Sequence, residues 1–211
     1  MSENESATKT EQARRVREMF AAIAARYDLL NHLLSGNIDK RWRRLVAKTI
    51  YHGLPQRDGR ILDVACGTGD LSLTLSESGK AHIVGLDFCR PMLDIAASKS
   101  TKRGARVPFI EGDALALPFR DRSFDCVTIA FGLRNLAELE SGLRELLRVL
   151  RPGGQVAVLE FSKPRYAVLR GLFRVYFTKL LPLIGGLISG SKGAYQYLPD
   201  SVSRFPDQKE L

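Results

Sequence analysis

Ile61-Leu-Asp-Val-Ala-Cys-Gly-Thr-Gly-Asp70 is the stretch that decides the fold of this chain. The apolar run at its start predicts a buried strand, and a helix should begin near Leu71. Between them, Gly67 and Gly69 let the backbone turn sharply and pass close to a ligand, because glycine has no side chain to block the approach. A strand, a glycine turn and a helix in this order are typical of a nucleotide-binding edge.

A second short strand, Ile83-Val-Gly-Leu-Asp87, ends in a carboxylate twenty residues after Gly67. At this place in a βαβ unit, a carboxylate can accept hydrogen bonds from both ribose hydroxyls of a nucleoside bound over the glycine turn. The glycine turn alone is weak evidence, since an ordinary strand-to-helix turn can contain the same residues. Together with Asp87 it predicts a nucleoside site.

The residue at the third glycine position of dinucleotide-binding enzymes is Ser72 here, and this makes a dehydrogenase the least favoured interpretation. S-adenosylmethionine fits better. It carries no phosphate, so the start of the helix need not hold an anion, and an acidic residue such as Asp63 or Asp70 can face the ligand's ammonium group. We therefore predict cofactor contacts from Asp63, Gly67 and Gly69.

A third segment, Phe109-Ile-Glu-Gly-Asp-Ala-Leu-Ala-Leu-Pro-Phe119, provides candidates for adenine recognition. The Asp113 carboxylate can accept a hydrogen bond from the adenine amino group, and the Ala114 backbone N–H can donate to a ring nitrogen. An alternative is that Asp113 caps the following turn, as aspartate often does. The two roles are compatible.

The composition sets the class of protein. A chain of 211 residues that is 45% apolar supports one domain with a full core. Three widely spaced cysteines indicate neither a disulfide framework nor a metal site, and the three histidines show no ligand spacing, so we expect a reducing cytoplasm and no metal. No apolar run reaches membrane-spanning length. Residues 1–10 are polar and should form a disordered tail.

The net charge of +9 is concentrated in two clusters. One is Lys40-Arg-Trp-Arg-Arg44, and the other follows a predicted amphipathic helix through Arg165, Arg170, Arg174 and Lys179. A basic amphipathic helix can rest on an anionic bilayer, although a core helix with a solvated face has the same pattern. We find no nucleic-acid-binding motif and expect no such partner.

Predicted strands and helices alternate along the chain, which indicates an α/β fold with a mainly parallel sheet and helices on both faces. Strands are expected at 61–65, 82–86, 106–110, 124–130 and 154–160, and helices at 70–78, 91–99 and 137–150. The segment Arg151-Pro-Gly-Gly154 should end the last helix. An N-terminal helix should cover the cleft, because apolar residues recur there at helical spacing: Val16, Met19, Phe20, Ile23 and Tyr27.

Further motifs resemble one family over nearly the whole chain. They lie at 20–31, 34–44, 195–198 and 205–208, and the most specific pair is Phe131-Gly-Leu-Arg-Asn135 with Leu159-Glu-Phe-Ser-Lys-Pro164. The chain is similar to the ubiquinone/menaquinone biosynthesis C-methyltransferases. The resemblance implies a Rossmann-like class I methyltransferase fold with Thr68, Asp87, Asp113 and Ala114 binding S-adenosylmethionine. Ala130 stands where some members place a cofactor-binding serine, so one hydrogen bond is expected to be weaker.

The implied reaction transfers a methyl group to a ring carbon of a reduced quinone that carries a polyprenyl tail. A ring hydroxyl has a pKa of about 10, so the enzyme should stabilise its anion. Arg134 is the candidate for this stabilisation, and Asn135 for holding a ring oxygen. Glu160 is the alternative proton acceptor, and Tyr27 and Tyr195 are expected to shape the acceptor pocket.

Demethylmenaquinol is the expected acceptor, with a benzoquinol or both left open. A nucleic-acid N-methyltransferase is disfavoured, because it would carry Asn-Pro-Pro-Tyr where this chain has residues 131–135. The resembled family continues beyond 205–208 with a helix and a β-hairpin. We therefore expect a single domain with an incomplete C-terminus, whose open sheet edge could pair with another copy, and a non-catalytic cofactor-binding scaffold is a further alternative.

Within this domain we expect three parts: an N-terminal helical cap at 11–55, a cofactor-binding core at 56–162, and a helical insert at 163–200 that faces the acceptor or the membrane. The expected partners are a polyprenylated hydroquinone and an anionic membrane surface. The protein is expected to be cytoplasmic, with peripheral membrane contact.

Overall fold

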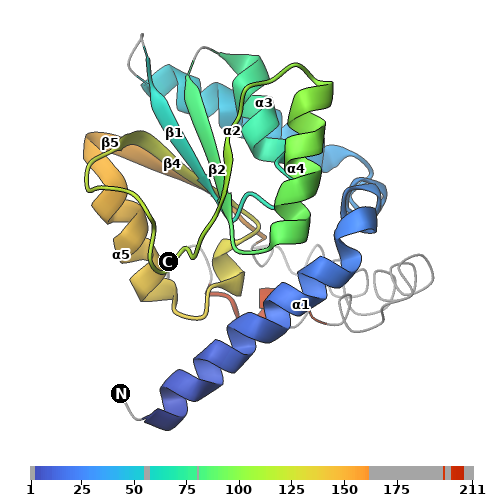
Figure 1. Ribbon diagram of the computed structural model, residues 1–211. Helices are drawn as coiled ribbons and strands as arrows, with labels where there is room; N and C mark the ends of the chain where they lie inside the picture. The colour runs from blue at the N-terminus through green and yellow to red at the C-terminus, as the bar shows by residue number, and fades with distance from the viewer. Residues whose placement is uncertain (1–2, 55–57, 80, 162–196, 198–200, 207–211) are drawn as a thin grey trace, which may run out of the picture.

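The computed structural model describes residues 3–54, 58–79, 81–161, 197 and 201–206, and for residues 3–9 it describes the backbone alone. Its centre is a sheet of five parallel strands in the order β3-β2-β1-β4-β5 (Figure 1). The strands are β1 (Arg60–Val64), β2 (His82–Asp87), β3 (Phe109–Glu111), β4 (Phe124–Ala130) and β5 (Leu150–Leu159). The chain order reverses between β1 and β4, which is where ligands bind in open α/β sheets.

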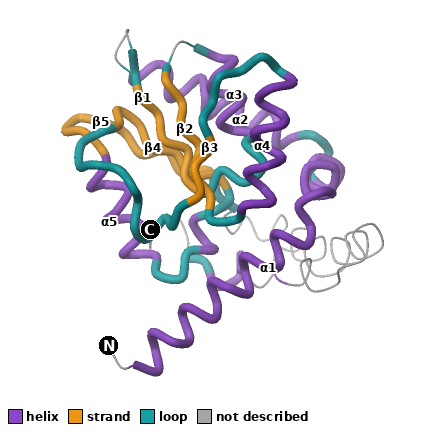
Figure 2. Tube along the Cα trace, in the orientation of Figure 1, coloured by secondary structure: helices purple, strands orange, loops and turns teal. Residues whose placement is uncertain are grey.

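Alternation along the strands divides the core into two layers. Ile61 packs with α2 (Ile38–Gly53) and α3 (Asp70–Ser78) on one face of the sheet. Its neighbour Leu62 points to the other face and packs with α5 (Leu139–Val149). The predicted parallel sheet with helices on both faces is thereby confirmed (Figure 2).

The N-terminal helix α1 (Glu3–Leu34) lies across the carboxyl ends of the strands and packs on α4 (Arg90–Lys102) (Figure 1). Ala24 of α1 packs against Met92 of α4, as the predicted covering helix requires. The helix begins at Glu3, so it includes most of residues 1–10, for which a disordered tail was predicted. Paired side chains one turn further on, such as Glu11 and Arg14, support this first part of the helix.

The end of α5 also differs from the sequence prediction. The helix ends at Val149 and β5 begins at Leu150, so Arg151 to Gly154 belong to the strand instead of ending the helix. The pairing of β4 with β5 shifts in register between Phe124 and Cys126, which marks a β-bulge. Gly153 has φ +78°, a conformation that glycine adopts without strain, and it lets the extra residues remain in the ladder.

β3 and β5 are the two edges of the sheet within the described ranges. Most of the expected helical insert at 163–200, including its basic residues, lies outside those ranges. None of the helices that the structure describes combines the length and hydropathy needed to cross a bilayer.

Candidate functional site

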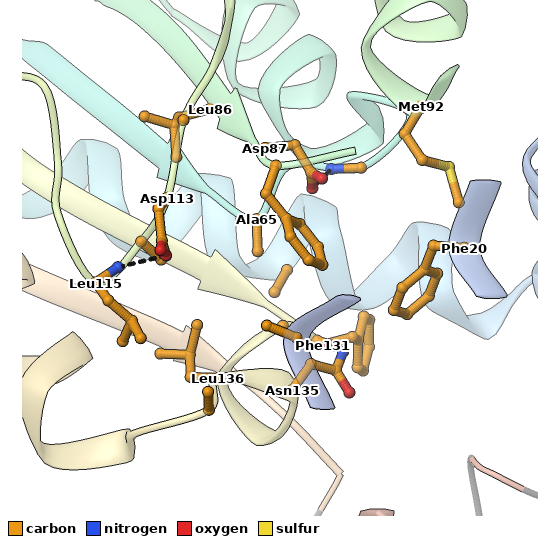
Figure 3. A pocket seen from close by; sticks show the side chains of 18 of the residues that line it. Phe20, Ala65, Leu86, Asp87, Met92, Asp113, Leu115, Phe131, Asn135 and Leu136 are labelled. Carbon is orange, nitrogen blue, oxygen red and sulfur yellow. Dashed lines mark hydrogen bonds between the residues drawn. The ribbon is translucent and has the colours of Figure 1, made fainter. Parts of the chain in front are cut away.

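One cavity opens at the carboxyl ends of the strands, beneath α1, with about 830 Å³ of empty space including its mouth (Figure 3). The cavity is open to solvent at this mouth, so its assignment depends on the residues that line it. The lining combines the turn after β1, the end of β2, the loop after β3, the end of β4 and one face of α1. Its predicted members are Tyr27, Gly67, Asp87, Asp113, Ala114, Ala130 and Asn135.

The two glycines of the turn have different surroundings. Gly67 lines the cavity with φ +54°, and a Cβ added there would meet nothing within 4 Å. Gly69 has φ +79°, and its added Cβ would lie 2.9 Å from both Ala96 and Phe109. Gly67 therefore gives a ligand access to the backbone, whereas Gly69 allows α3 to pack closely against its neighbours.

Asp87 connects the end of β2 to the glycine turn. Its Oδ2 accepts a 2.8 Å hydrogen bond from the Gly67 N–H, and its Oδ1 accepts one of 2.8 Å from the Cys89 N–H. Burial raises the pKa of this carboxyl, while the backbone donors oppose the rise. The side chain lines the cavity, and a carboxylate has lone pairs left for two ribose hydroxyls.

Asp113 lies on the opposite side of the cavity from Phe20 of α1 (Figure 3), and the next residue, Ala114, also lines the cavity. The Asp113 Oδ1 accepts a 2.9 Å hydrogen bond from the Leu115 N–H, which is the turn-capping role expected from the sequence. The side chain is nevertheless exposed and its other oxygen can accept a bond from a ligand. The two roles proposed for Asp113 are therefore geometrically compatible.

Asp63 is fully buried inside the fold. Its Oδ2 accepts a 2.5 Å bond from the Ser72 hydroxyl and its Oδ1 accepts one of 2.7 Å from Thr128. Burial raises its pKa to about 6, with both hydroxyls opposing the rise. It does not line the cavity in the described part of the chain, so this geometry does not support the expected contact with an ammonium group. Ser72, which stands at the third glycine position of the dinucleotide-binding pattern, holds this carboxylate by its hydrogen bond.

Thr68 joins the glycine turn to two helices. Its hydroxyl donates a 2.5 Å bond to the Asp28 carboxylate of α1, and the Lys99 ammonium of α4 donates to the other Asp28 oxygen at 2.8 Å. Lys99 also pairs with Asp70 at the start of α3. Burial raises the pKa of Asp70, but Lys99 and Arg43 outweigh it and the pKa is lowered. The side chains of Thr68 and Asp70 therefore already have partners within the protein, namely Asp28 and Lys99. No local sequence pattern predicted that Asp28 and Lys99 would take part.

His32, Asp39 and Asp70 extend this network and place possible metal ligands within 4.8 Å of one another. A guanidinium already occupies the group: Arg43 pairs with Asp39 and lies 3.4 Å from Asp70. Asp39 also accepts from the His32 Nδ1 at 2.8 Å and from the Ser35 hydroxyl at 2.7 Å. Because these carboxylates are neutralised by cationic side chains, we assign no metal to them.

The predicted catalytic residues come together where β4 and β5 end. Arg134 and Glu160 form an ion pair whose side chains are 7% and 5% exposed. The Arg134 guanidinium lies 5.7 Å above the Phe161 ring, and its Nε donates to the Ser201 hydroxyl at 3.3 Å. Neither member of the pair lines the cavity as described, so both lie behind its wall.

Asn135 is the member of this group that reaches the cavity (Figure 3). Its Nδ2 donates to the Phe131 carbonyl at 3.3 Å, and its Oδ1 accepts a 3.0 Å bond from the Tyr197 hydroxyl. Tyr195, which the sequence favoured, lies outside the described residues, whereas Tyr197 was not predicted. Tyr27 lines the cavity from α1, and burial raises its pKa.

The backbone is strained at the ends of the two central strands. Ala65 follows β1 with φ +52°, and Phe131 follows β4 with φ +56°, a region that non-glycine residues rarely adopt. Both line the cavity, and a Cβ on Gly132 would lie only 2.5 Å from the Ala65 Cβ. Such strain is concentrated at functional sites, so it supports the assignment of this cavity.

A family model described as the ubiE/COQ5 methyltransferase family matches residues 7–211. A demethylmenaquinone methyltransferase of Thermus thermophilus is 54% identical over 92% of this chain and 87% of its own length. A protein of the same name from Deinococcus radiodurans is 48% identical over 96% of this chain and 83% of its own length. A ubiquinone/menaquinone biosynthesis C-methyltransferase UbiE of Geotalea uraniireducens is 46% identical over 96% of this chain and 86% of its own length.

Solved structures agree on the fold. A SAM-dependent methyltransferase from Aquifex aeolicus has a TM-score of 0.51 at 24% identity and aligns over 57% of this chain and 66% of that one. The [4+2]-cyclase SpnF has a TM-score of 0.62 at 28% identity over 74% of this chain and 63% of that one. The chain thus spans just under two thirds of each solved chain. A cyclase with this architecture shows that the fold alone does not decide the reaction.

Proposed function

Because the chain belongs to the ubiE/COQ5 methyltransferase family, we propose that it methylates a ring carbon of demethylmenaquinol to give menaquinol. The observation that carries this proposal is the family match over residues 7–211 together with 54% identity to a demethylmenaquinone methyltransferase. S-adenosylmethionine is the cofactor of such an enzyme, and it supplies an electrophilic methyl group on a sulfonium.

The cavity fits the adenosine part of this cofactor. Asp87 offers acceptors for the ribose hydroxyls at the edge where Gly67 leaves the backbone open. Asp113 and Ala114 lie across the cavity with an acceptor and a backbone donor for adenine. Apolar side chains from β2 and α4, Leu86 and Met92, line the cavity beside them and suit a flat base.

The acceptor site is proposed at the other end of the cavity, around the end of β4. There Phe131 and Asn135 lie near Phe20 of α1 (Figure 3), and Tyr27 of α1 also lines the cavity. Aromatic walls suit a fused ring, and the Asn135 amide, oriented by Tyr197, can hold a ring oxygen. This placement excludes water and aligns the ring for attack, which is the main contribution of a site to a proximity-driven reaction.

Arg134 and Glu160 are proposed to act from behind Asn135. Carbon is a poor nucleophile until a ring hydroxyl is ionised, and the Arg134 guanidinium stabilises the resulting anion. When bound, S-adenosylmethionine would supply the methyl group and leave as S-adenosylhomocysteine, and the ring carbon that gains the methyl group would lose its proton. Glu160 is the candidate acceptor for a proton relayed by water, because a guanidinium offers no acceptor for it. The ion pair fixes the position of both groups.

A dual acceptor range is the second candidate, and the names of relatives favour it. The Geotalea protein, 46% identical, is named for both ubiquinone and menaquinone biosynthesis. The experiment is mass spectrometry of quinones in a strain that lacks its own enzyme and carries this chain. Menaquinone alone would support the first proposal, both quinones would support the second, and a strain that accumulates only the demethyl precursor would overturn both.

An acceptor with a polyprenyl tail resides in a bilayer, so we also propose peripheral contact with an anionic membrane. The excess of basic residues supports this part of the proposal, because the cytoplasmic leaflet attracts positive charge.

A further inference from the structure

Four large apolar side chains are exposed where α1 meets α2. Leu29 and Leu33 of α1 are 62% and 55% exposed, and Ile38 and Leu45 of α2 are 47% and 63% exposed. A tight turn joins the two helices, since the Gly36 N–H donates to the Leu33 carbonyl at 3.2 Å. Leu33 and Ile38 therefore flank the same turn. We call these four residues the α1–α2 corner.

Positive charge lies beside the apolar residues of the α1–α2 corner on α2. Lys40, Arg41, Arg44 and Lys48 are all exposed on α2. The acidic residue between Ile38 and Lys48 is Asp39, which is buried and paired with Arg43. The charges that this helix presents to solvent between those positions are thus all positive. Exposed leucines beside lysine and arginine match the two attractions of an anionic bilayer, one apolar and one electrostatic.

The α1–α2 corner also leads to the cavity. Trp42 follows Ile38 by four residues and precedes Leu45 by three, so the three side chains share one side of α2. The Trp42 ring lies 6.3 Å from the ring of Phe131, which lines the cavity. Phe161 completes an aromatic group, with ring centroids 6.2 Å from Trp42 and 4.8 Å from Phe131. Apolar surface therefore continues from the corner to the cavity wall.

We propose that the α1–α2 corner is the surface that inserts into the headgroup region of an anionic membrane and turns the cavity toward an acceptor held there. This inference rests on the proposed function for the identity of the acceptor, but the membrane contact itself is tested independently. Leu29, Leu33, Ile38 and Leu45 insert, and the four basic residues hold the phosphate headgroups.

The test is retention of the whole protein by vesicles of phosphatidylglycerol and phosphatidylcholine at low salt. Leu33→Gln with Leu45→Gln should lower the vesicle affinity at least about tenfold, since two leucines no longer insert. The matched control is Leu147→Gln on α5, because Leu147 is 62% exposed and Leu45 63%. Arg41→Gln with Arg44→Gln and Lys48→Gln should lower the affinity by about fivefold per charge. Substitution of Lys102, Arg106 and Arg120 by Gln is the control for net charge, because these three residues are also exposed.

Equal losses from the α1–α2 variants and their controls would overturn the proposal, as would equal binding to purely neutral vesicles. A concentration-dependent dimer that the leucine variants abolish, without vesicle binding by the parent chain, would assign the corner to a second copy and also overturn it. Methyl transfer to a short-tailed acceptor in detergent should be unchanged in all these variants. Failure of that reaction in the parent chain would instead count against the proposed function.

Discussion

The Asp28 carboxylate of α1 accepts a 2.5 Å hydrogen bond from the hydroxyl of Thr68 in the glycine turn, although forty positions separate the two residues. Thr68 is 2% exposed, so the bond is shielded from water. Lys99 holds the same carboxylate from α4. The N-terminal helix is therefore bonded directly to the glycine turn that lines the cavity.

Asp28→Ala should weaken both the fold and cofactor binding. Loss of a hydrogen bond to a charged group costs about 1.5 kcal/mol or more, and a loosened turn should lower cofactor affinity about tenfold. Urea unfolding and calorimetry measure the two effects. Asp94→Ala is the control, because Asp94 pairs with Arg90 at the surface, where the two side chains are 62% and 66% exposed, respectively. This substitution should cost less than about 0.5 kcal/mol of stability. If Asp28→Ala changed stability and cofactor affinity no more than this control does, the role of the Asp28–Thr68 hydrogen bond would be disproved.

Asp63 should make stability fall as the pH rises from 4 to 6. Its pKa is about 6 in the fold, above its usual value of 3.8, so in this window the folded state holds a proton that the unfolded state has lost. The stabilisation is complete below pH 4 and is lost through pH 6, by about 2 to 3 kcal/mol. Asp63→Asn removes this dependence. Urea unfolding of both proteins at several pH values tests it, and parallel pH profiles would refute it.

The two glycines of the turn should respond differently to alanine. Gly69→Ala collides with Ala96 and Phe109 and has an unfavourable φ, so unfolding free energy should fall by about 3 kcal/mol. Gly67→Ala meets open space and should cost about 1 to 2 kcal/mol from its φ alone. Its methyl group enters the cavity instead, so cofactor affinity should fall about a hundredfold. Thermal unfolding and calorimetry separate these effects, and the reverse order would refute the assignment.

Arg134→Ala should abolish turnover while cofactor affinity changes less than about threefold, because the guanidinium is proposed to act on the acceptor and not on the cofactor. It also leaves Glu160 buried without its partner, at a cost of about 3 to 5 kcal/mol. The double variant Arg134→Met with Glu160→Leu should recover much of that stability but no activity. Return of methyl transfer in the double variant would show that the pair has only a structural role.

Tyr197→Phe should lower kcat/KM for the acceptor about fivefold, since Asn135 loses a hydrogen bond of about 1 kcal/mol that orients it. Cofactor affinity should not change. Tyr51→Phe is the control, because the Tyr51 hydroxyl donates to the Leu75 carbonyl at 2.8 Å on the other side of the molecule. It should reduce stability by a similar amount without affecting the acceptor, and equal kinetic effects would refute the assignment.

The sequence predicted the sheet well because its signals are local. Buried strands read as apolar runs, and the glycine turn and Asp87 have a fixed spacing within one βαβ unit. The strand order and the gathering of Gly67, Asp87 and Asp113 in one cavity follow from the topology of that fold. The boundary at 150–154 was missed because Pro and Gly usually end a helix, whereas here they form a bulge.

The polar interior could not be predicted in the same way. Whether Asp63 faces a ligand or a hydroxyl depends on Ser72 and Thr128, which reach it from other elements. Thr68 likewise finds its acceptor on α1. Such pairings depend on tertiary packing, and a single sequence contains no periodicity that marks them. The resemblance indicated Arg134, Asn135 and Glu160, but not that Arg134 and Glu160 form a buried ion pair outside the cavity lining.

Helix α1 is synthesised before every strand of the sheet, yet it packs against Met92 of α4 and Val202. It should therefore dock only after most of the domain has left the ribosome, and until then its apolar face stays open to chaperones. The nascent sheet can form first. The cavity is complete only when α1, the first segment to be synthesised, packs over the carboxyl ends of the strands.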